Sequence, residues 1–148
     1  MVDGLPISLF LADVAGSLEY AGVRALSYLD VDVCLVCFSV LSQESLENVK
    51  RNWVPELELH CSKARRVLVG TKCDLRHDVH IIERLAEKNQ RVVTTEEALA
   101  LAKELHFDEY VDCSALTQEG LKRCFDVAIR AAIRASESTP ERKKCIIT

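Results

Sequence analysis

The sequence has 148 residues, of which 49% are hydrophobic and 28% are charged, and its formal net charge is −4 at pH 7. This composition indicates one globular domain rather than a disordered chain, and the negative charge argues against a nucleic-acid-binding protein. The longest uninterrupted apolar run, at residues 33–38, is too short to span a bilayer, and the N-terminus lacks the basic region of a signal peptide, so we expect the chain to begin in the cytosol.

The hydrophobic pattern predicts strands that alternate with helices along the chain. Short apolar runs rich in β-branched residues predict strands at residues 7–12, 31–40, 67–69 and 110–113. Such an alternation predicts a mainly parallel sheet with helices on both of its faces. We therefore expect a single α/β domain over residues 1–135, followed by a polar and basic tail over residues 136–148.

Helix starts are marked by residues that cap helices. Ser42 is expected to cap a helix whose apolar residues recur at helical spacing, with Pro55 bending or weakening it. Thr94 and Glu97 form the pattern of a capping box, which predicts a helix that continues to residue 105. Thr117 is expected to cap the last helix of the domain.

The seven cysteines are an odd number and lie mostly within apolar segments, which favours reduced thiols over a disulfide framework. Cys34 and Cys37 form a C-x-x-C pattern inside a predicted strand. Because side chains alternate between the two faces of a strand, these two thiols are expected to point in opposite directions. They are therefore interpreted as ordinary strand residues rather than as metal ligands or a redox pair.

Three short segments follow three of the predicted strands. They are residues 13–16 (DVAG), 71–74 (TKCD) and 114–116 (SAL). Open α/β sheets bind ligands at the carboxyl ends of their strands, so these segments predict a binding site. Each pattern is weak by itself, but their order along the chain and their places after the strands are specific.

On these segments the sequence resembles the Rho/Rac family of small GTPases, and the matching text includes VCFSV, LVGTK, DLR and CSALTQ. The resemblance covers almost the whole chain and implies a P-loop GTPase-like α/β fold. The polar stretch after Leu75 coincides with the extra helical insert of Rho relatives. It also implies binding of guanine nucleotides (GTP or GDP) with Mg²⁺, GTP hydrolysis, Rho-type effectors and regulators, and a role in small GTPase signalling.

The resemblance assigns reading of the base to the second and third segments. Asp74 would accept both hydrogens on the Watson–Crick edge of guanine, an arrangement that rejects adenine. The alternative is that Lys72 and Asp74 are only a solvated pair in a turn. The resemblance assigns the remaining base contacts to Thr71, Lys72, Ser114, Ala115 and Leu116.

The resemblance assigns the phosphate end of the nucleotide to the first segment. Asp13 would hold Mg²⁺ through a water molecule, and Ala15 and Gly16 would lie near the γ-phosphate. Ser17 stands where the family has the glutamine that positions the attacking water. Serine is too short for that role, so the catalytic position is degenerate.

The pattern of a phosphate-binding loop, G-x-x-x-x-G-K-[ST], does not occur in the 148 residues, and the first switch is not found either. The family fold would then lack its first strand, which lies between the strands expected at residues 7–12 and 31–40. Those two strands must pair directly, leave a gap, or expose apolar edges. A second hypothesis therefore stays open, in which the chain is a non-catalytic pseudo-GTPase or a shortened product that acts as a protein-interaction module.

The chain ends in Cys145-Ile146-Ile147-Thr148, which fits a C-a-a-X prenylation pattern, and Arg142, Lys143 and Lys144 precede it. A prenyl chain with adjacent basic charge is a two-signal membrane anchor. We therefore expect lipidation at Cys145 and a location on the cytoplasmic face of membranes, with a cytosolic pool.

Overall fold

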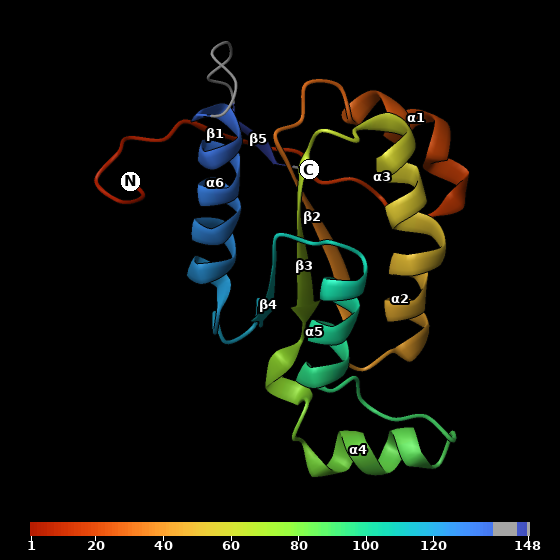
Figure 1. Ribbon diagram of the computed structural model, residues 1–148. Helices are drawn as coiled ribbons and strands as arrows, with labels where there is room; N and C mark the ends of the chain where they lie inside the picture. Colours follow the sequence, from red (N-terminus) through yellow and green to blue (C-terminus); the bar gives the residue numbers. More distant parts are fainter. Residues whose placement is uncertain (138–144, 148) are drawn as a thin grey trace.

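A computed structural model describes residues 1–137 and 145–147, and its centre is a sheet of five parallel strands in the order β1-β5-β2-β3-β4 (Figure 1). Helices cover both faces of the sheet, so the predicted parallel α/β architecture is confirmed. The strands are β1 (Leu9–Leu11), β2 (Val33–Ser39), β3 (Arg65–Thr71), β4 (Glu109–Cys113) and β5 (Cys145–Ile147). The helices are α1 (Ala21–Ser27), α2 (Gln43–Asn48), α3 (Val54–His60), α4 (Val79–Ala86), α5 (Thr95–Glu104) and α6 (Leu121–Glu137), with short helical turns η1 (Leu18–Tyr20), η2 (Val49–Trp53) and η3 (Cys73–Leu75).

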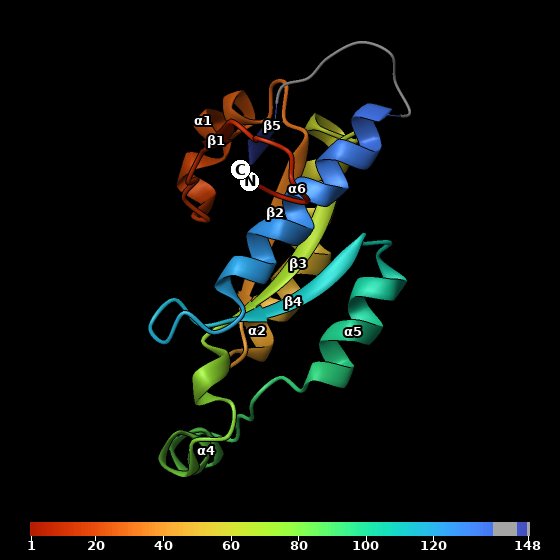
Figure 2. The ribbon, with the colours of Figure 1, turned by 90° about the vertical axis from the view of Figure 1, so that its left-hand side faces the viewer.

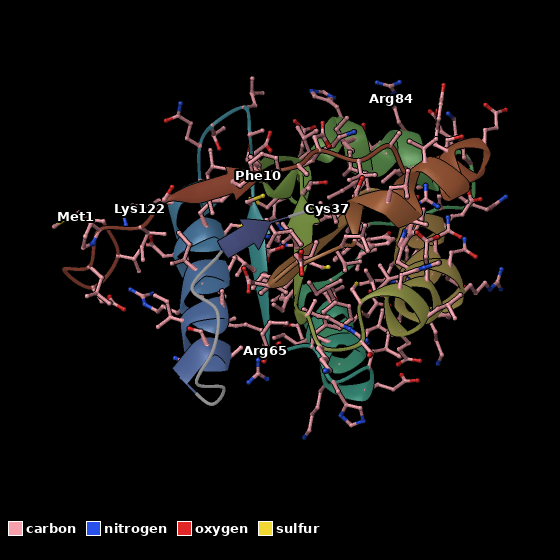
Figure 3. The ribbon with its side chains drawn as sticks, turned by 90° about the horizontal axis from the view of Figure 1, so that it is seen from above. Met1, Phe10, Cys37, Arg65, Arg84 and Lys122 are labelled. Atoms are coloured by element: carbon pink, nitrogen blue, oxygen red, sulfur yellow. The ribbon has the colours of Figure 1, made fainter. Side chains whose placement is uncertain are left out.

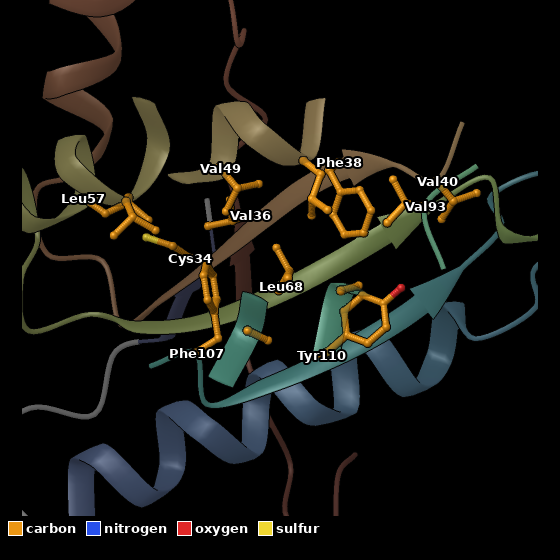
Figure 4. Close-up of a cluster of buried hydrophobic side chains, with 14 of the residues drawn as sticks. Cys34, Val36, Phe38, Val40, Val49, Leu57, Leu68, Val93, Phe107 and Tyr110 are labelled. Atoms are coloured by element: carbon orange, nitrogen blue, oxygen red, sulfur yellow. The ribbon is translucent and has the colours of Figure 1, made fainter. Parts of the chain in front are cut away.

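Two hydrophobic cores lie on the opposite faces of the sheet. Cys34, Val36 and Phe38 of β2 pack into the larger core with α2, α3 and α5, as Figure 4 shows for several of its side chains. Val33 of the same strand packs into the second core, beneath α6. Cys37 lies on the same side as Val33 and is exposed, so the two thiols of the C-x-x-C pattern do point to opposite faces.

The predicted helix starts at Ser42 and Thr94 are confirmed. The Ser42 hydroxyl accepts a hydrogen bond from Ser45 N, and Thr94 and Glu97 form both bonds of a capping box. Pro55 lies in the first turn of α3, where proline is tolerated, and the preceding turn η2 is a π-helix that absorbs the irregularity.

The predicted cap at Thr117 is wrong, because the last helix begins four residues later, at Leu121. The Thr117 amide instead donates to the Ser114 hydroxyl within a turn, at 3.1 Å. The first intrahelical bond runs from Cys124 N to Gly120 O, so Gly120 stands at the helix start. Turn chemistry at residues 114–120 outweighed the local capping preference of threonine.

Helix α4 stands apart from the body of the domain, beyond the carboxyl end of β3 (Figures 1 and 2). None of its residues is buried, and its Arg84 lies at the periphery of the molecule in Figure 3. Asp78 caps it by accepting from Ile81 N at 3.0 Å. Among the residues that the structure describes, no helix is long and apolar enough to cross a membrane.

The described parts of the C-terminal tail belong to a helix and a strand of the domain. Helix α6 continues to Glu137, two residues past the expected domain boundary, and Cys145–Ile147 form β5 inside the sheet. Strand β5 lies between β1 and β2, so the chain's own C-terminal segment stands where the first strand of the family fold was expected to be missing. Residues 138–144, which include the basic run, and Thr148 lie outside the described residues.

Candidate functional site

The segment after β3 forms a tight turn at the carboxyl end of that strand. The Thr71 hydroxyl donates to Phe38 O at 2.9 Å, which ties the end of β3 to β2. Lys72 adopts a left-handed backbone conformation with φ of 61°, and its carbonyl accepts from Leu75 N at 3.0 Å. The Lys72 side chain is exposed, while the turn brings Asp74 back against the domain.

Asp74 carries the most informative feature of this turn. Its Oδ1 atom is buried and has no hydrogen-bond partner among the described residues. A buried carboxylate oxygen without a donor is unfavourable, and such groups in native proteins commonly mark a ligand site. A ligand that presents N–H donors, as the edge of guanine does, would satisfy this oxygen.

The segment after β4 lies beside this turn, because Thr71 pairs with Cys113 in the sheet. Ser114 is fully buried, and its amide donates to Glu119 O at 2.9 Å. Ala115 and Leu116 are exposed, with 85% of Leu116 accessible to solvent. Since the Ser114 amide is already bonded, the expected contact to a guanine oxygen falls to the Ala115 amide.

Arg76 holds the two loops together, and sequence reasoning did not single it out. Its guanidinium donates two hydrogen bonds to the Asp112 carboxylate, at 2.8 and 2.6 Å, and one to the Tyr110 hydroxyl at 3.1 Å. Its Nε donates to Val93 O at 3.1 Å, and the residue is buried. Because Arg76 directly follows η3, this network fastens the turn that carries Asp74 onto β4. The signal that could have identified Arg76 in the sequence is its place in the DLR match, two residues after Asp74.

The same network determines the charge state of its members. Burial raises the pKa of the Asp112 carboxyl, but the hydrogen bonds from Arg76 and Tyr110 outweigh burial and hold that pKa below its ordinary value. The hydrogen bond to Asp112 also raises the pKa of Arg76. The pair is therefore ionised throughout the physiological range.

The segment of Asp13 is placed differently from the other two. Leu11 is level with Ile147, and Ile147 is level with Val33, the first residue of β2. Two residues further on, outside the described strands, Asp13 lines a cavity with residues 34–37 of β2, short of Ser39 at the end of that strand. The structure thus brings the segments of Asp74 and Ser114 together but leaves that of Asp13 at another level along the strands.

Carbonyls of the Asp13 segment are held by Arg24 of α1. The Arg24 guanidinium donates to Ala15 O at 2.7 Å and to Ser17 O at 2.9 Å. It also forms an ion pair with Glu56, at 2.6 Å, and lies over the ring of Trp53 at 5.1 Å. Gly16 faces the same ring, so these contacts pack the segment onto η2 and α3.

A cavity of about 550 Å³ opens between this segment and β2. Its walls include Asp13 and Val14 on one side and the strand residues Cys34 and Cys37 on the other, with Trp53 from the helical layer. Asp13 is exposed. Within the described part of the chain no group of three or more His, Cys, Asp or Glu side chains is arranged to hold a metal ion.

A family model for the Ras family matches residues 1–134, which is most of the chain. This chain belongs to the Ras family. It is a small GTPase domain of the Ras superfamily, and binding of guanine nucleotide is the general property of that family. Ras-family GTPases generally use Mg²⁺ together with the nucleotide.

The residues of this Ras-family chain fit the base end of a guanine nucleotide better than its phosphate end. At the base end the unpartnered Asp74 oxygen and the neighbouring Ala115 amide supply an acceptor and a donor. At the phosphate end, Asp13 is the residue that would hold Mg²⁺, and the 148 residues contain no phosphate-loop motif. The described residues therefore offer an acceptor and a donor to a base, and the sequence offers few charged groups that could bind phosphate.

Proposed function

We propose that this chain is a Rho-like member of the Ras family that recognises guanine through Asp74 and binds nucleotide weakly. The unpartnered, buried Asp74 oxygen is the observation that carries the proposal. Helix α4 supports the Rho-like assignment, because it stands after Leu75 as a separate exposed helix, at the position of the Rho insert. Rho-type effectors and regulators are the partners that this assignment implies.

Hydrolysis of GTP is not part of the proposal. Ser17 occupies the position that would orient the attacking water, and Arg24 holds its carbonyl against the domain. A serine hydroxyl at this position is too short to replace the glutamine amide. The chain is therefore proposed to act as a pseudo-GTPase, whose output is a protein contact rather than a turnover.

Base recognition is tested by exchanging Asp74 for asparagine. We expect the unmodified chain to bind GDP weakly, with no stoichiometric nucleotide after purification, because phosphate and metal contacts supply most of the affinity of small GTPases. GDP should still bind better than ADP, by roughly tenfold to a hundredfold, the worth of a hydrogen bond to a charged group. Asp74→Asn should reverse the preference towards xanthosine diphosphate, whose base carries an acceptor where guanine has an amino group. Titrations followed by NMR chemical shifts measure all three.

The control for this exchange is the exposed Asp13, because Asp13→Asn should leave base preference unchanged. Equal binding of GDP and ADP by the unmodified chain would contradict base recognition. Retention of stoichiometric nucleotide through purification would contradict the weak binding.

Membrane association is proposed through lipidation of Cys145. The Cys145-Ile146-Ile147-Thr148 ending and the basic residues 142–144 support this part of the proposal. We expect the chain expressed in a eukaryotic cell to gain the mass of one isoprenoid and to sediment with membranes, and Cys145→Ser to remain in the supernatant. Intact-mass measurement decides the matter, because an unmodified chain in the membrane fraction would assign its attachment to something other than a prenyl group.

A further inference from the structure

Strand β5 is the link that joins β1 to the rest of the sheet. In the described sheet β1 pairs with β5 alone, through Leu9–Cys145, Phe10–Ile146 and Leu11–Ile147. Strand β5 in turn pairs with β2 at Val33–Ile147. Figure 3 shows β5 beside β1, viewed from above. The C-terminal segment therefore completes the sheet between β1 and β2, and its removal would leave β1 without a pairing to the rest of the sheet.

The path of the chain makes this insertion simple. Helix α6 runs from the carboxyl end of β4 back towards the amino ends of the strands, and β5 then enters parallel to its neighbours. Seven residues separate Glu137 from Cys145, which reach up to about 25 Å when extended. A helix is the usual connection between two parallel strands.

The insertion is also weakly held compared with the rest of the sheet. Strands β2 and β3 pair over seven residues, whereas β5 pairs with β1 over three and with β2 over one. Each backbone hydrogen bond contributes only about 1 kcal/mol net, so short terminal strands open far more often than the core. Beyond Val33, the edge of β2 that faces β1 has no partner strand among the described residues and lines the cavity.

These observations bear directly on the lipidation proposed above. In prenyl transfer the Cys145 thiolate attacks the first carbon of an isoprenyl diphosphate, a C–S bond forms, diphosphate leaves, and the thiol proton passes to solvent. The modifying enzyme needs the C-terminal residues extended and free. Residues 145–147 cannot lie in that enzyme while their backbone is paired with β1 and β2.

We propose that the C-terminal segment exchanges between two places, a strand of the sheet in which Cys145 is withheld from modification, and a released form in which Cys145 is lipidated and the slot between β1 and β2 is open. The lipidation of the released form rests on the function proposed above, whereas the insertion of residues 145–147 as a strand does not. Lipidation then traps the released form, because a membrane-bound prenyl chain holds the segment away from the sheet. The chain thereby couples anchoring to loss of its fifth strand.

The strand half is tested by cysteine pairing in the full chain. Leu9→Cys should form a disulfide with Cys145 under mild oxidation, since the two residues are paired across neighbouring strands. The matched control is Leu11→Cys, which lies two residues, or about 6.6 Å, further along the same face and should not pair with Cys145. Both leucines are exposed, so neither change disturbs a core. Peptide mapping by mass spectrometry identifies the disulfide bonds. If Cys145 pairs equally with both positions, or with neither, the pairing of β5 with β1 is contradicted.

The coupling is tested by locking β5 while Cys145 stays free. The double variant Leu11→Cys with Ile147→Cys joins the last pair of the two strands. Its reduced and oxidised forms are offered farnesyl diphosphate, and in parallel geranylgeranyl diphosphate, with a eukaryotic prenyltransferase extract. We expect the isoprenoid mass on Cys145 in the reduced form and its loss in the oxidised form. The unmodified chain, treated in the same way, tests the lipidation with the natural ending, because Ile147→Cys changes the C-a-a-X sequence. No isoprenoid mass on the unmodified chain would contradict both the lipidation and the coupling but not the placement of β5. Equal labelling of the reduced and oxidised forms would contradict the coupling alone.

Discussion

Replacing Gly120 by alanine is expected to unfold the domain or destabilise it by about 3 kcal/mol or more. Gly120 has φ of +68°, and a Cβ atom placed there would lie 2.1 Å from Asp112 O. Both the left-handed backbone and the collision with main-chain atoms oppose any side chain. Because the collision involves Cβ itself, Gly120→Asn should fare no better, although asparagine tolerates positive φ. Chemical denaturation followed by circular dichroism measures the loss.

The matched control for this change is Gly22→Ala in helix α1. A Cβ atom at Gly22 would meet nothing within 4 Å, and the residue is exposed. Alanine is the better helix former, so this variant should be unchanged or more stable by up to about 1 kcal/mol. Equal stability of the Gly120 and Gly22 variants would refute the proposed packing of the 114–120 loop against β4.

Replacing Arg76 by methionine is the second change with a large expected effect. It removes the partner of the Asp112 carboxylate and the donor to Val93 O, both within a buried network. Breaking a buried ion pair by removing one partner costs about 3 kcal/mol or more, because the remaining charge is left without compensation. The turn that carries Asp74 should loosen as well, so hydrogen exchange at residues 72–76 should accelerate more than in the sheet.

The control for Arg76→Met is Arg91→Met, since Arg91 forms a similar bidentate pair with Glu97 on the surface. Exposed pairs contribute little to stability, so the effect of Arg91→Met should be small.

The effect of Arg76→Met should also depend on pH. The lowered pKa of Asp112 contributes stability that is present above the ordinary aspartate pKa near 4 and is lost as the pH falls through the folded pKa. The stability gap between the unmodified chain and Arg76→Met should therefore narrow below about pH 4, and a gap that does not change with pH would contradict the role given to Asp112.

Most of the fold could be predicted from local signals. The strands at residues 31–40 and 110–113, the capping of α2 by Ser42 and the capping box of α5 all depend on a few neighbouring residues, and all were confirmed. The cap at Thr117 was predicted in the wrong place, because the loop bond from the Ser114 amide to Glu119 O holds the chain in a turn until Gly120. A bond of that kind has no signature in hydrophobic periodicity.

The candidate site was likewise only partly predictable from the sequence. The residues that could read guanine follow strands whose ends meet at one edge of a parallel sheet, so their neighbourhood was predictable from their order along the chain. The unpartnered oxygen of Asp74 was not, because burial of one atom depends on every element packed around it. Nor were the partners of Arg76, which come from positions 17 to 36 residues away.

The sequence by itself determined the strand and helix pattern, the motifs and, through them, the family, because periodicity, caps and motif spacing are properties of adjacent residues. Only the tertiary structure decided how β1 joins the sheet. Its register runs through Cys145–Ile147, more than 130 residues away in the chain, and withdraws Asp13 from the edge where Asp74 lies. Pairing between strands depends on which backbone edges remain unpaired once the other elements have packed. This cannot be predicted from the pattern of neighbouring residues.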